Sequence, residues 1–302
     1  MHYNSFNEAM RRQFGGKVYK LALDGGMGCP NRDGTCGTRG CIFCSEQGSG
    51  DFAAPRCEDI RTQLENAKAR VRQKAPDAKY IAYFQSYTNT HAPLAHLRRL
   101  FTQAIGQPEI VALSVATRPD CLPPETVALL QEFNACKPVW VELGLQTIHE
   151  ATARYIRRGY ALPVFDDAVQ RLKQAGLTVI VHQILGLPGE SHEQMLETTR
   201  YIGASGADGI KLQLLHVLEG TDLADEWRDG KVPVMDMDAY FALLCDCIRV
   251  LPPEMVIHRL TGDGPKRILL APLWTGDKKR VLNEMNRVFT RENVVQGQWY
   301  KK

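Results

Sequence analysis

Residues 29–44 read CPNRDGTCGTRGCIFC, and this stretch holds four of the nine cysteines in the chain. A closed structural zinc site commonly uses two pairs of ligands, each pair spaced by two to four residues. Cys41 and Cys44 form one such pair, whereas Cys29 and Cys36 have six residues between them and do not form a second. The spacing alone does not assign a metal, so the role of the stretch depends on the fold around it.

Strand-like and helix-like segments alternate along the chain on both sides of this loop. Residues 18–23, VYKLAL, predict a strand that leads directly into it. Further strands are predicted at residues 79–88, 109–117, 138–147, 177–187 and 208–218. Helical spacing of apolar residues predicts helices at residues 58–73, 92–105, 123–133, 149–158, 164–176 and 191–206. Apolar strands that alternate with helices are typical of a parallel sheet covered on both faces.

Six strand–helix units predict a barrel that does not close. Eight units would form a complete barrel of about 250 residues. We therefore expect an α/β fold in which residues 17–218 form a partial (βα)6 barrel similar to a TIM barrel. Residues 1–16 would form an N-terminal helical extension, and residues 219–302 would form an α-rich C-terminal extension over the barrel mouth.

The composition is that of a globular protein in a reducing compartment. Of the 302 residues, 44% are hydrophobic and 24% are charged, and no apolar run reaches the eighteen or so residues that a membrane span needs. The N-terminal residues lack the apolar core of a signal peptide, and the cysteines do not have the pattern of a secreted disulfide framework. We therefore expect a cytoplasmic protein with no membrane partner. The net charge of +3 does not predict nucleic-acid binding by itself, although the segment from Asp277 is rich in lysine and arginine.

The place of the cysteine loop favours an iron–sulfur cluster. Loops at the carboxyl ends of barrel strands carry the catalytic groups in this architecture. Three thiolates can hold a [4Fe–4S] cluster and leave one iron open to a substrate or cofactor. A zinc site formed by all four cysteines of the loop is the alternative.

The motif CPNRDGT…GCIFC resembles the cysteine motif of the radical S-adenosylmethionine (radical SAM) superfamily. It is similar to a branch with an extended first spacer, related to coproporphyrinogen dehydrogenase and to enzymes like the catalytic subunit of Elongator. The ligands of that branch are the cysteine before Pro-Asn-Arg-Asp-Gly and the closing pair, which implies Cys29, Cys41 and Cys44 here. Cys36 lies at a position where the branch does not require cysteine. The spacing also allows the alternative ligand set Cys36, Cys41 and Cys44, in which Cys36 replaces Cys29.

The resemblance implies a [4Fe–4S] cluster and S-adenosylmethionine (SAM) as cofactors. One electron passed to the cluster would split SAM into methionine and a 5′-deoxyadenosyl radical, which would abstract hydrogen from a substrate at the barrel mouth. Because the chain lacks a dinucleotide-binding fingerprint, we expect the electron to come from a flavodoxin- or ferredoxin-like partner.

Polar groups at the ends of the second and third strands are candidate SAM contacts. The superfamily carries glycines and an acidic residue after strand two, whereas this chain has the uncharged groups Gln85, Tyr87, Thr88 and Asn89. They would hydrogen-bond a zwitterionic amino acid, or they would simply close a turn. Ser114 and Thr117 would meet the ribose or the methionyl group. Arg118 would pair with a substrate carboxylate or with Asp120.

Glu142 and Gln146 lie on the same face of the fourth predicted strand. A carboxylate inside an apolar strand is costly unless it is paired, and related enzymes imply a hydrogen bond between Glu142 and SAM. The alternative is a structural ion pair with Arg157 or Arg158. The step from Arg158 to Gly159 is similar to one in the relatives, in which the arginine helps to position SAM.

The fifth and sixth strands supply the remaining candidates. Ile184 would offer adenine an apolar contact, and Gly186 would let the backbone approach it. His182 is either a core residue or a substrate contact. Lys211 in a central strand is costly without a role, so we expect it to contact the substrate or the SAM carboxylate. The cysteines outside the loop show no second trio, and we expect them to be small buried residues: Cys57, Cys121, Cys136, Cys245 and Cys247.

These features predict a radical SAM enzyme. Some members of the resembled branch are implicated in removing a carboxymethyl unit from the side chain of wobble uridine in tRNA, and a basic C-terminal segment would suit an RNA partner. Radical oxidation of a porphyrin or another small molecule is the enzymatic alternative. A non-catalytic scaffold that binds zinc or an iron–sulfur cluster is the rival from a different class.

Overall fold

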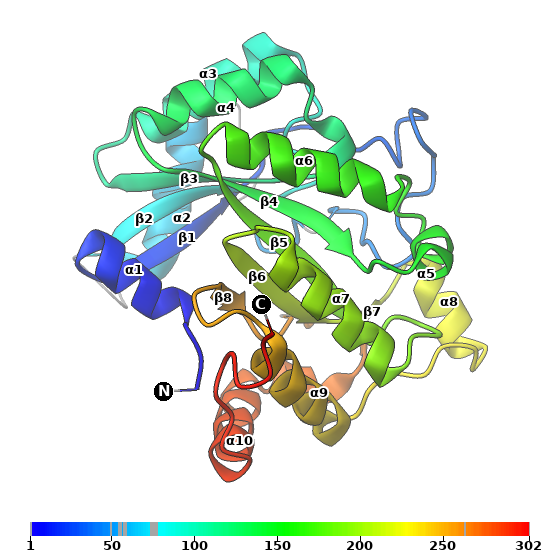
Figure 1. Cartoon of the computed structure of the whole chain (residues 1–302). Coiled ribbons are helices and arrows are strands. Elements are labelled where there is room, and N and C mark those ends of the chain that lie inside the picture. Colours follow the sequence, from blue (N-terminus) through cyan, green and yellow to red (C-terminus); the bar gives the residue numbers. More distant parts are fainter. Residues whose placement is uncertain are drawn as a thin grey trace.

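The chain forms a curled parallel sheet with helices packed outside it (Figure 1). The computed structural model describes residues 2–48, 50–53, 56, 59–72, 78–262 and 264–301. The strands are β1 (Val18–Leu23), β2 (Lys79–Phe84), β3 (Ile110–Thr117), β4 (Val139–Gln146), β5 (Thr178–Leu185), β6 (Gly209–Leu214), β7 (Val217–Leu218), β8 (Val256–Arg259) and β9 (Leu269–Ala271). The α-helices are α1 (Phe6–Phe14), α2 (Ile60–Arg72), α3 (Leu94–Ile105), α4 (Pro124–Asn134), α5 (Glu150–Tyr155), α6 (Leu162–Gln174), α7 (His192–Ala204), α8 (Asp222–Arg228), α9 (Met237–Val250) and α10 (Lys278–Arg291). Two 3-10 helices are η1 (Pro119–Cys121) and η2 (Leu273–Gly276).

The sheet has seven strands within the described residues, in the order β1-β2-β3-β4-β5-β6-β8. All neighbouring strands in it are parallel. The first six follow one another in sequence as strand–helix units, which confirms the predicted partial barrel. No helix in the described part of the chain is long and apolar enough to cross a membrane.

The C-terminal part contributes more strand than predicted. β8 extends the barrel sheet beside β6, and β9 pairs antiparallel with β7. The predicted sixth strand is therefore two strands, because the chain leaves β6 after Leu214 and turns to pair elsewhere. The predicted boundary between the barrel and the C-terminal extension at Leu218 stays a prediction. Strand β8 lies after this boundary in the sequence, yet it belongs to the barrel sheet.

Helices α2, α3, α4, α6 and α7 cover the outer face of the sheet (Figure 1). Aromatic packing holds this layer: the rings of Phe84 in β2 and Phe101 in α3 meet edge-on with centroids 5.1 Å apart, and both side chains are fully buried. Truncating a phenylalanine at such a site to alanine costs about 3–5 kcal/mol. The apolar strands therefore form a rigid support for the loops at their carboxyl ends.

The N-terminal segment covers the open side of the barrel. Helix α1 is capped by Ser5 and ends at Gly15, whose φ of 73° suits glycine. It packs on both β1 and β8, the two edges that do not pair with each other. The amide of Ile257 in β8 also donates to the Asn4 carbonyl at 2.9 Å. This contact satisfies part of a strand edge that would otherwise be exposed.

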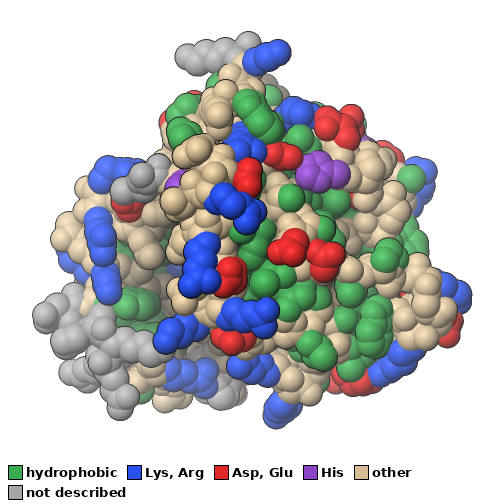
Figure 2. Space-filling view, turned by 90° about the horizontal axis from the view of Figure 1, so that it is seen from below, with side chains coloured by type: hydrophobic (Ala, Val, Ile, Leu, Met, Phe, Trp, Pro, Cys, Tyr) green, Lys and Arg blue, Asp and Glu red, His purple; other side chains and the backbone are tan. Residues whose placement is uncertain are grey.

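On the face seen from below, Lys and Arg side chains lie at several places, with Asp and Glu side chains among them (Figure 2).

Candidate active site

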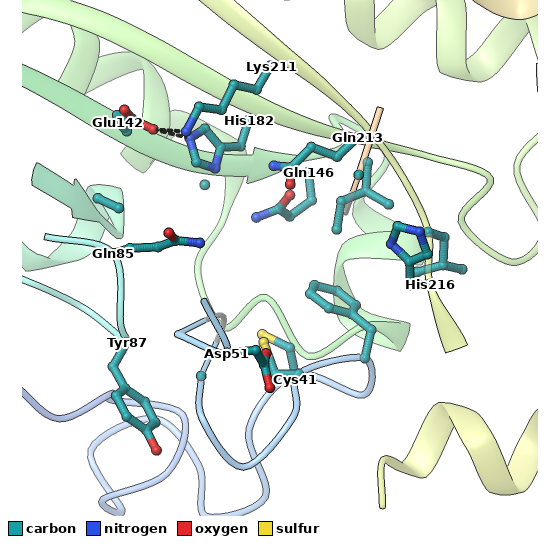
Figure 3. A pocket seen from close by; sticks show the side chains of 18 of the residues that line it. Cys41, Asp51, Gln85, Tyr87, Glu142, Gln146, His182, Lys211, Gln213 and His216 are labelled. Carbon is teal, nitrogen blue, oxygen red and sulfur yellow. Dashed lines mark hydrogen bonds and ion pairs between the residues drawn. The ribbon is translucent and has the colours of Figure 1, made fainter. Parts of the chain in front are cut away.

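A cavity opens inside the curled sheet near the carboxyl ends of its strands (Figure 3). Side chains that extend into it from the sheet side are Gln85, Gln146, His182, Lys211 and Gln213. Cys41 and Asp51 lie on the opposite side, on the cysteine-rich loop and the segment after it. This is the end of the barrel at which the sequence predicts chemistry.

Cys29, Cys41 and Cys44 all line the cavity. Cys36 does not: it is exposed and lines a separate surface pocket together with His91 and Cys121. Within the described ranges, no group of three or more His, Cys, Asp or Glu side chains is close enough to hold a single metal ion. The thiolates of a three-cysteine [4Fe–4S] site bind three different irons, so they surround a cluster and do not converge on one ion.

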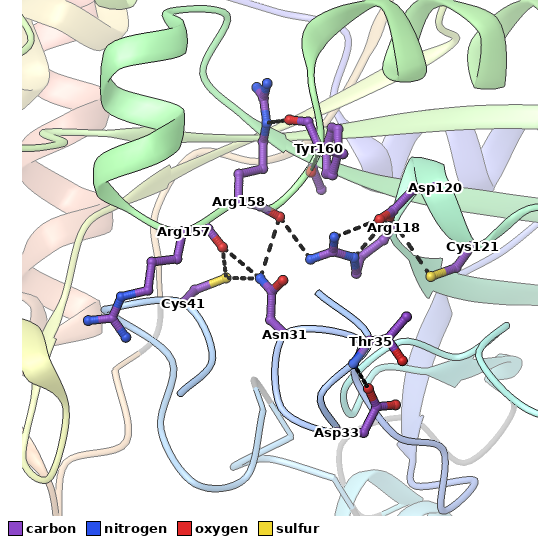
Figure 4. Close-up of polar contacts among 11 residues, drawn as sticks. Asn31, Asp33, Thr35, Cys41, Arg118, Asp120, Cys121, Arg157, Arg158 and Tyr160 are labelled. Carbon is purple, nitrogen blue, oxygen red and sulfur yellow. Dashed lines mark hydrogen bonds and ion pairs between the residues drawn. The ribbon is translucent and has the colours of Figure 1, made fainter. Parts of the chain in front are cut away.

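The cysteine loop is fastened to the segment after α5 (Figure 4). The buried amide of Asn31 donates to the Arg157 carbonyl at 2.6 Å and to the Cys41 sulfur at 3.4 Å. Hydrogen bonding with Cys44, and then with Asn31, lowers the pKa of Cys41 to about 7 although burial opposes this. The lowered pKa favours the thiolate of Cys41, which is the form that binds metal, whereas the same hydrogen bond, together with burial, raises the pKa of Cys44 well above its usual value.

Arg118 and Arg158 hold the same region from the other side (Figure 4). Arg118 pairs with Asp120 at 2.7 Å and donates to the Arg158 carbonyl at 2.8 Å. Arg158 is 3% exposed, and its guanidinium donates to the Thr147 carbonyl at 2.6 Å and to Glu150 at 3.0 Å. Arg158 therefore holds the segment between β4 and α5 in place beside the cavity.

Glu142 forms the centre of a buried polar network at the cavity floor. It is fully buried and accepts hydrogen bonds from Ser114 Oγ at 2.6 Å, His182 Nε2 at 2.7 Å, Lys20 Nζ at 2.5 Å and Lys211 Nζ. The expected alternative pairing with Arg157 or Arg158 is wrong, because these pair with Asp222 and Glu150. The partners of Glu142 come instead from the adjacent strands β3 and β5 and from the more distant strands β1 and β6, whose side chains meet inside the barrel.

The floor is rich in basic side chains. Burial lowers the pKa of Lys211 to about 7 and also lowers that of Lys20. Burial opposes ionisation of Glu142, but Lys20 and Lys211 hold its pKa well below the usual range. Arg259 lines the cavity and lies near enough to lower the pKa of both lysines. Lys20 and Lys211 therefore contact Glu142 directly, and Arg259 lies close to the two lysines.

Most of the predicted SAM contacts line the cavity: Gln85, Tyr87, Thr117, Glu142, Gln146, Arg158, Ile184 and Lys211. Three others do not line it. Ser114 lies behind the floor against Glu142, Asn89 donates to the Ala116 carbonyl, and Gly186 faces Met235. The roles of all these residues in SAM binding stay predictions.

Gln146 fits a bound ligand particularly well. Its side chain points into the cavity (Figure 3), and its buried Oε1 has no hydrogen-bond partner among the described residues. A buried acceptor without a partner costs about 1–3 kcal/mol, which an amino or hydroxyl donor of SAM would remove. Thiolates on one wall and an unsatisfied amide on the other suit SAM bound at a cluster.

Sequence reasoning missed Lys20, Asn31, Tyr83 and Arg259. Lys20 carries the signal that singled out Lys211, a lysine inside an apolar strand. Tyr83 has no such signal, yet its hydroxyl lies 3.1 Å from Lys211 Nζ.

Cys121, Cys245 and Cys247 are buried as predicted. Cys136 is exposed, which corrects the prediction, because it follows the end of α4 at the surface. Cys57 lies outside the described residues.

Comparison with known proteins places most of the chain in one family. The Radical SAM superfamily model matches residues 28–202, and the Radical_SAM C-terminal domain model matches residues 207–291. The protein YtqA of Bacillus subtilis (strain 168) is 44% identical over 300 residues, which cover 99% of this chain and 93% of YtqA. The tRNA uridine(34) acetyltransferase of Dehalococcoides mccartyi (strain CBDB1) is 29% identical over 171 residues, which cover 56% of this chain and 37% of that protein.

A solved structure shows the same fold. The archaeal Methanocaldococcus infernus Elp3 with an N-terminal deletion matches with a TM-score of 0.70 at 16% identity, over 92% of this chain and 64% of that chain. The family model covers more than half of the chain and includes the cysteine loop, which confirms the resemblance drawn from its motif. The chain therefore belongs to the radical SAM superfamily, and it is an enzyme whose cofactors are a [4Fe–4S] cluster and SAM.

Proposed function

We propose that this enzyme removes the carboxymethyl unit from the carboxymethylaminomethyl side chain of wobble uridine in tRNA. The similarity to a tRNA uridine(34) acetyltransferase supports a tRNA substrate. The observation that carries the proposal is the basic cavity floor, where Lys211 and Arg259 line the space that the cysteine loop closes from the other side. A substrate carboxylate in this space would lie close to the basic side chains of Lys211 and Arg259, and a nearby opposite charge favours the ionised carboxylate.

The cavity residues divide into three groups in this proposal. Cys29, Cys41 and Cys44 hold the cluster, which supplies reductive cleavage of SAM when it is bound. Gln85 and Gln146 hydrogen-bond SAM. Lys211 and Arg259 orient the substrate carboxylate, while the ion pair with Glu142 holds Lys211 in place. A flavodoxin- or ferredoxin-like protein delivers the electron.

The proposed reaction balances with one external electron acceptor. A hydrogen atom would pass from the methylene between the substrate nitrogen and its carboxylate to the 5′-deoxyadenosyl group from SAM, which would leave as 5′-deoxyadenosine. One electron then passes to a one-electron carrier protein, which leaves an iminium group. Addition of water breaks the carbon–nitrogen bond, releases a two-carbon oxo acid and a proton, and leaves aminomethyluridine in the tRNA. The carboxylate leaves with the oxo acid, so the basic floor contacts only the part of the substrate that is removed.

The test uses anaerobically reconstituted enzyme, SAM, tRNA that contains carboxymethylaminomethyluridine, and a flavodoxin- or ferredoxin-like carrier protein that dithionite reduces only in part, so that both an electron donor and an electron acceptor are present. We expect 5′-deoxyadenosine, and nucleoside mass spectrometry should show conversion to aminomethyluridine. The Cys44→Ala variant should form neither product. Cleavage of SAM with an unchanged nucleoside would reject the tRNA substrate, and consumption of a porphyrinogen in its place would favour the small-molecule alternative.

A further inference from the structure

A second groove adjoins the cavity at the protein surface. The two share four lining residues, which are Asp51, Phe52, Gly264 and Pro265. The basic residues that line the groove come from separate parts of the chain: Arg56, Arg70, Lys266, Arg267 and Lys278. Arg70 belongs to α2, Lys278 begins α10, and Lys266 and Arg267 precede β9. We call this surface the basic groove.

The basic groove carries charge that the described structure does not neutralise. Arg56, Arg70, Lys266 and Arg267 are exposed and form no ion pair with a described residue. Basic side chains elsewhere on the surface are commonly paired, as Arg98 is with Glu132 and Arg228 is with Glu219. Unpaired cations gathered in one concave surface repel one another unless an anion binds there.

The acidic residues of the groove have other partners. Asp24 accepts a hydrogen bond from the Gly26 amide at 2.8 Å, and Asp51 accepts one from Ser45 Oγ at 2.9 Å. Asp277 accepts one from the Arg280 amide at 3.1 Å, which caps α10. Among the described residues, none of these three carboxylates forms an ion pair with a basic residue of the groove.

Helix α10 adds to the positive potential at the same place. Its first turn contains Lys278, Lys279 and Arg280 and no acidic residue. The amino end of a helix is already electropositive, so cations there destabilise the helix slightly and anions stabilise it. Three cations at this end therefore favour a negatively charged partner over the groove.

Phe52 lies where the basic groove meets the cavity. Its side chain lines both, and the residue is 49% exposed, which is unusual for a large aromatic residue. Proteins that bind single-stranded nucleic acid combine a basic groove with exposed aromatic rings on which bases stack. The basic side chains would suit the phosphates of a nucleotide chain, and the exposed ring of Phe52 would suit its bases.

We propose that the basic groove binds the sugar–phosphate backbone of the RNA beside the modified nucleotide, and that a neighbouring base stacks on Phe52. This inference rests on the proposed function, because it supplies the route by which a wobble nucleotide reaches the cavity. Lys266, Arg267 and Lys278 contact phosphates, and Phe52 stands at the entrance.

The test measures binding of a synthetic anticodon stem–loop RNA to the cluster-loaded enzyme over a range of salt concentrations. Each lost phosphate contact lowers the slope of log affinity against log salt by about 0.7 for a single strand. We expect Lys266→Ala/Arg267→Ala to lower the slope by about 1.4 and to weaken binding. Phe52→Ala should weaken binding roughly tenfold without changing the slope.

The matched control is Arg98→Ala/Arg99→Ala, which removes two adjacent exposed charges from α3 and should leave the slope unchanged. Melting temperature and iron content show whether each variant is intact. If removing Lys266 and Arg267 together perturbs the fold, the single variants Lys266→Gln and Arg267→Gln decide, because each removes one charge and keeps most of the side chain. A slope lowered by about 0.7 in each variant supports the groove, and the wild-type slope in both overturns it.

Different results would contradict RNA binding in the basic groove and the tRNA substrate itself. RNA binding by the wild type that is unaffected by Lys266→Ala/Arg267→Ala would overturn the groove and leave the tRNA substrate standing. SAM cleavage by a wild type that binds no RNA would instead overturn the proposed function.

Discussion

The side-chain amide of Asn31 donates a hydrogen bond to the Cys41 sulfur at 3.4 Å. The same nitrogen lies 2.6 Å from the Arg157 carbonyl, so one buried amide joins the cysteine loop to the end of the α5 segment. Gly159 makes the approach sterically feasible: a Cβ at this position would lie 2.6 Å from Asn31 Oδ1, and its φ of 83° favours glycine. The loop is thus positioned by side chains that do not themselves bind metal.

Replacing Asn31 by aspartate should impair cluster binding. A carboxylate would remove the donor and place negative charge beside the thiolate of Cys41. Partners that orient metal ligands are worth about 10–100-fold in metal affinity, and we expect a loss of that order. The measurement is iron and sulfide per chain after anaerobic reconstitution. Asn283→Asp on the exposed face of α10 is the control, and equal iron in both variants would contradict the role of Asn31.

Substituting Cys29 and Cys36 separately should identify the third ligand. We expect Cys29→Ala to lose the cluster, because Cys29 lines the cavity with Cys41 and Cys44. We expect Cys36→Ala to retain iron, because Cys36 is exposed in a different pocket. Iron content and SAM cleavage measure both variants. The opposite pattern would show that Cys36 is the ligand.

The barrel could be predicted because each of its first six strands is a local apolar run. β1 covers residues 18–23, as VYKLAL predicts. β8 was missed because it is only four residues long, Val256–Arg259, and contains two polar side chains. It forms by pairing with β6, which would otherwise be the edge of the sheet. This strand therefore depends on a partner that is distant in the sequence and not on its own residue pattern.

The candidate site could be predicted residue by residue but not pair by pair. Glu142 and Lys211 can each be recognised from the local sequence, because a charged side chain inside an apolar strand is costly to bury without a partner. Their mutual contact, and the contact of Glu142 with Lys20, depend on how the sheet curls to bring β1, β4 and β6 together. Asn31 gave no local signal, because its role depends on a carbonyl 126 positions away.

Replacing Glu142 by glutamine should destabilise the folded protein strongly. The change leaves Lys20 and Lys211 buried without their counter-charge. Breaking a buried ion pair by removing one partner costs about 3–5 kcal/mol, and we expect a loss of this order in the free energy of unfolding. Urea denaturation measures it. Glu132→Gln is the matched control, because Glu132 forms an exposed pair with Arg98 worth less than about 1 kcal/mol. Similar losses in both variants would refute the network at the floor.

His182 should make the folded protein less stable as the pH falls below neutrality. Burial and the charge of Lys211 lower the pKa of His182 to about 4, from an ordinary value of 6.5. The unfolded chain therefore binds a proton at a pH where the folded chain does not, so stability decreases as pH falls through this window. Between about pH 7.5 and about pH 5 the loss from this group should approach 2 kcal/mol.

Urea denaturation of the cluster-loaded protein across that pH range measures the effect. His182→Gln is the informative comparison, because glutamine can still donate to Glu142 but does not titrate. The free energy of unfolding of the variant should fall less steeply with pH than that of the wild type, by the share that His182 contributes. Parallel curves would mean that His182 is not held neutral by its burial, and the electrostatic description of the floor would then have to change.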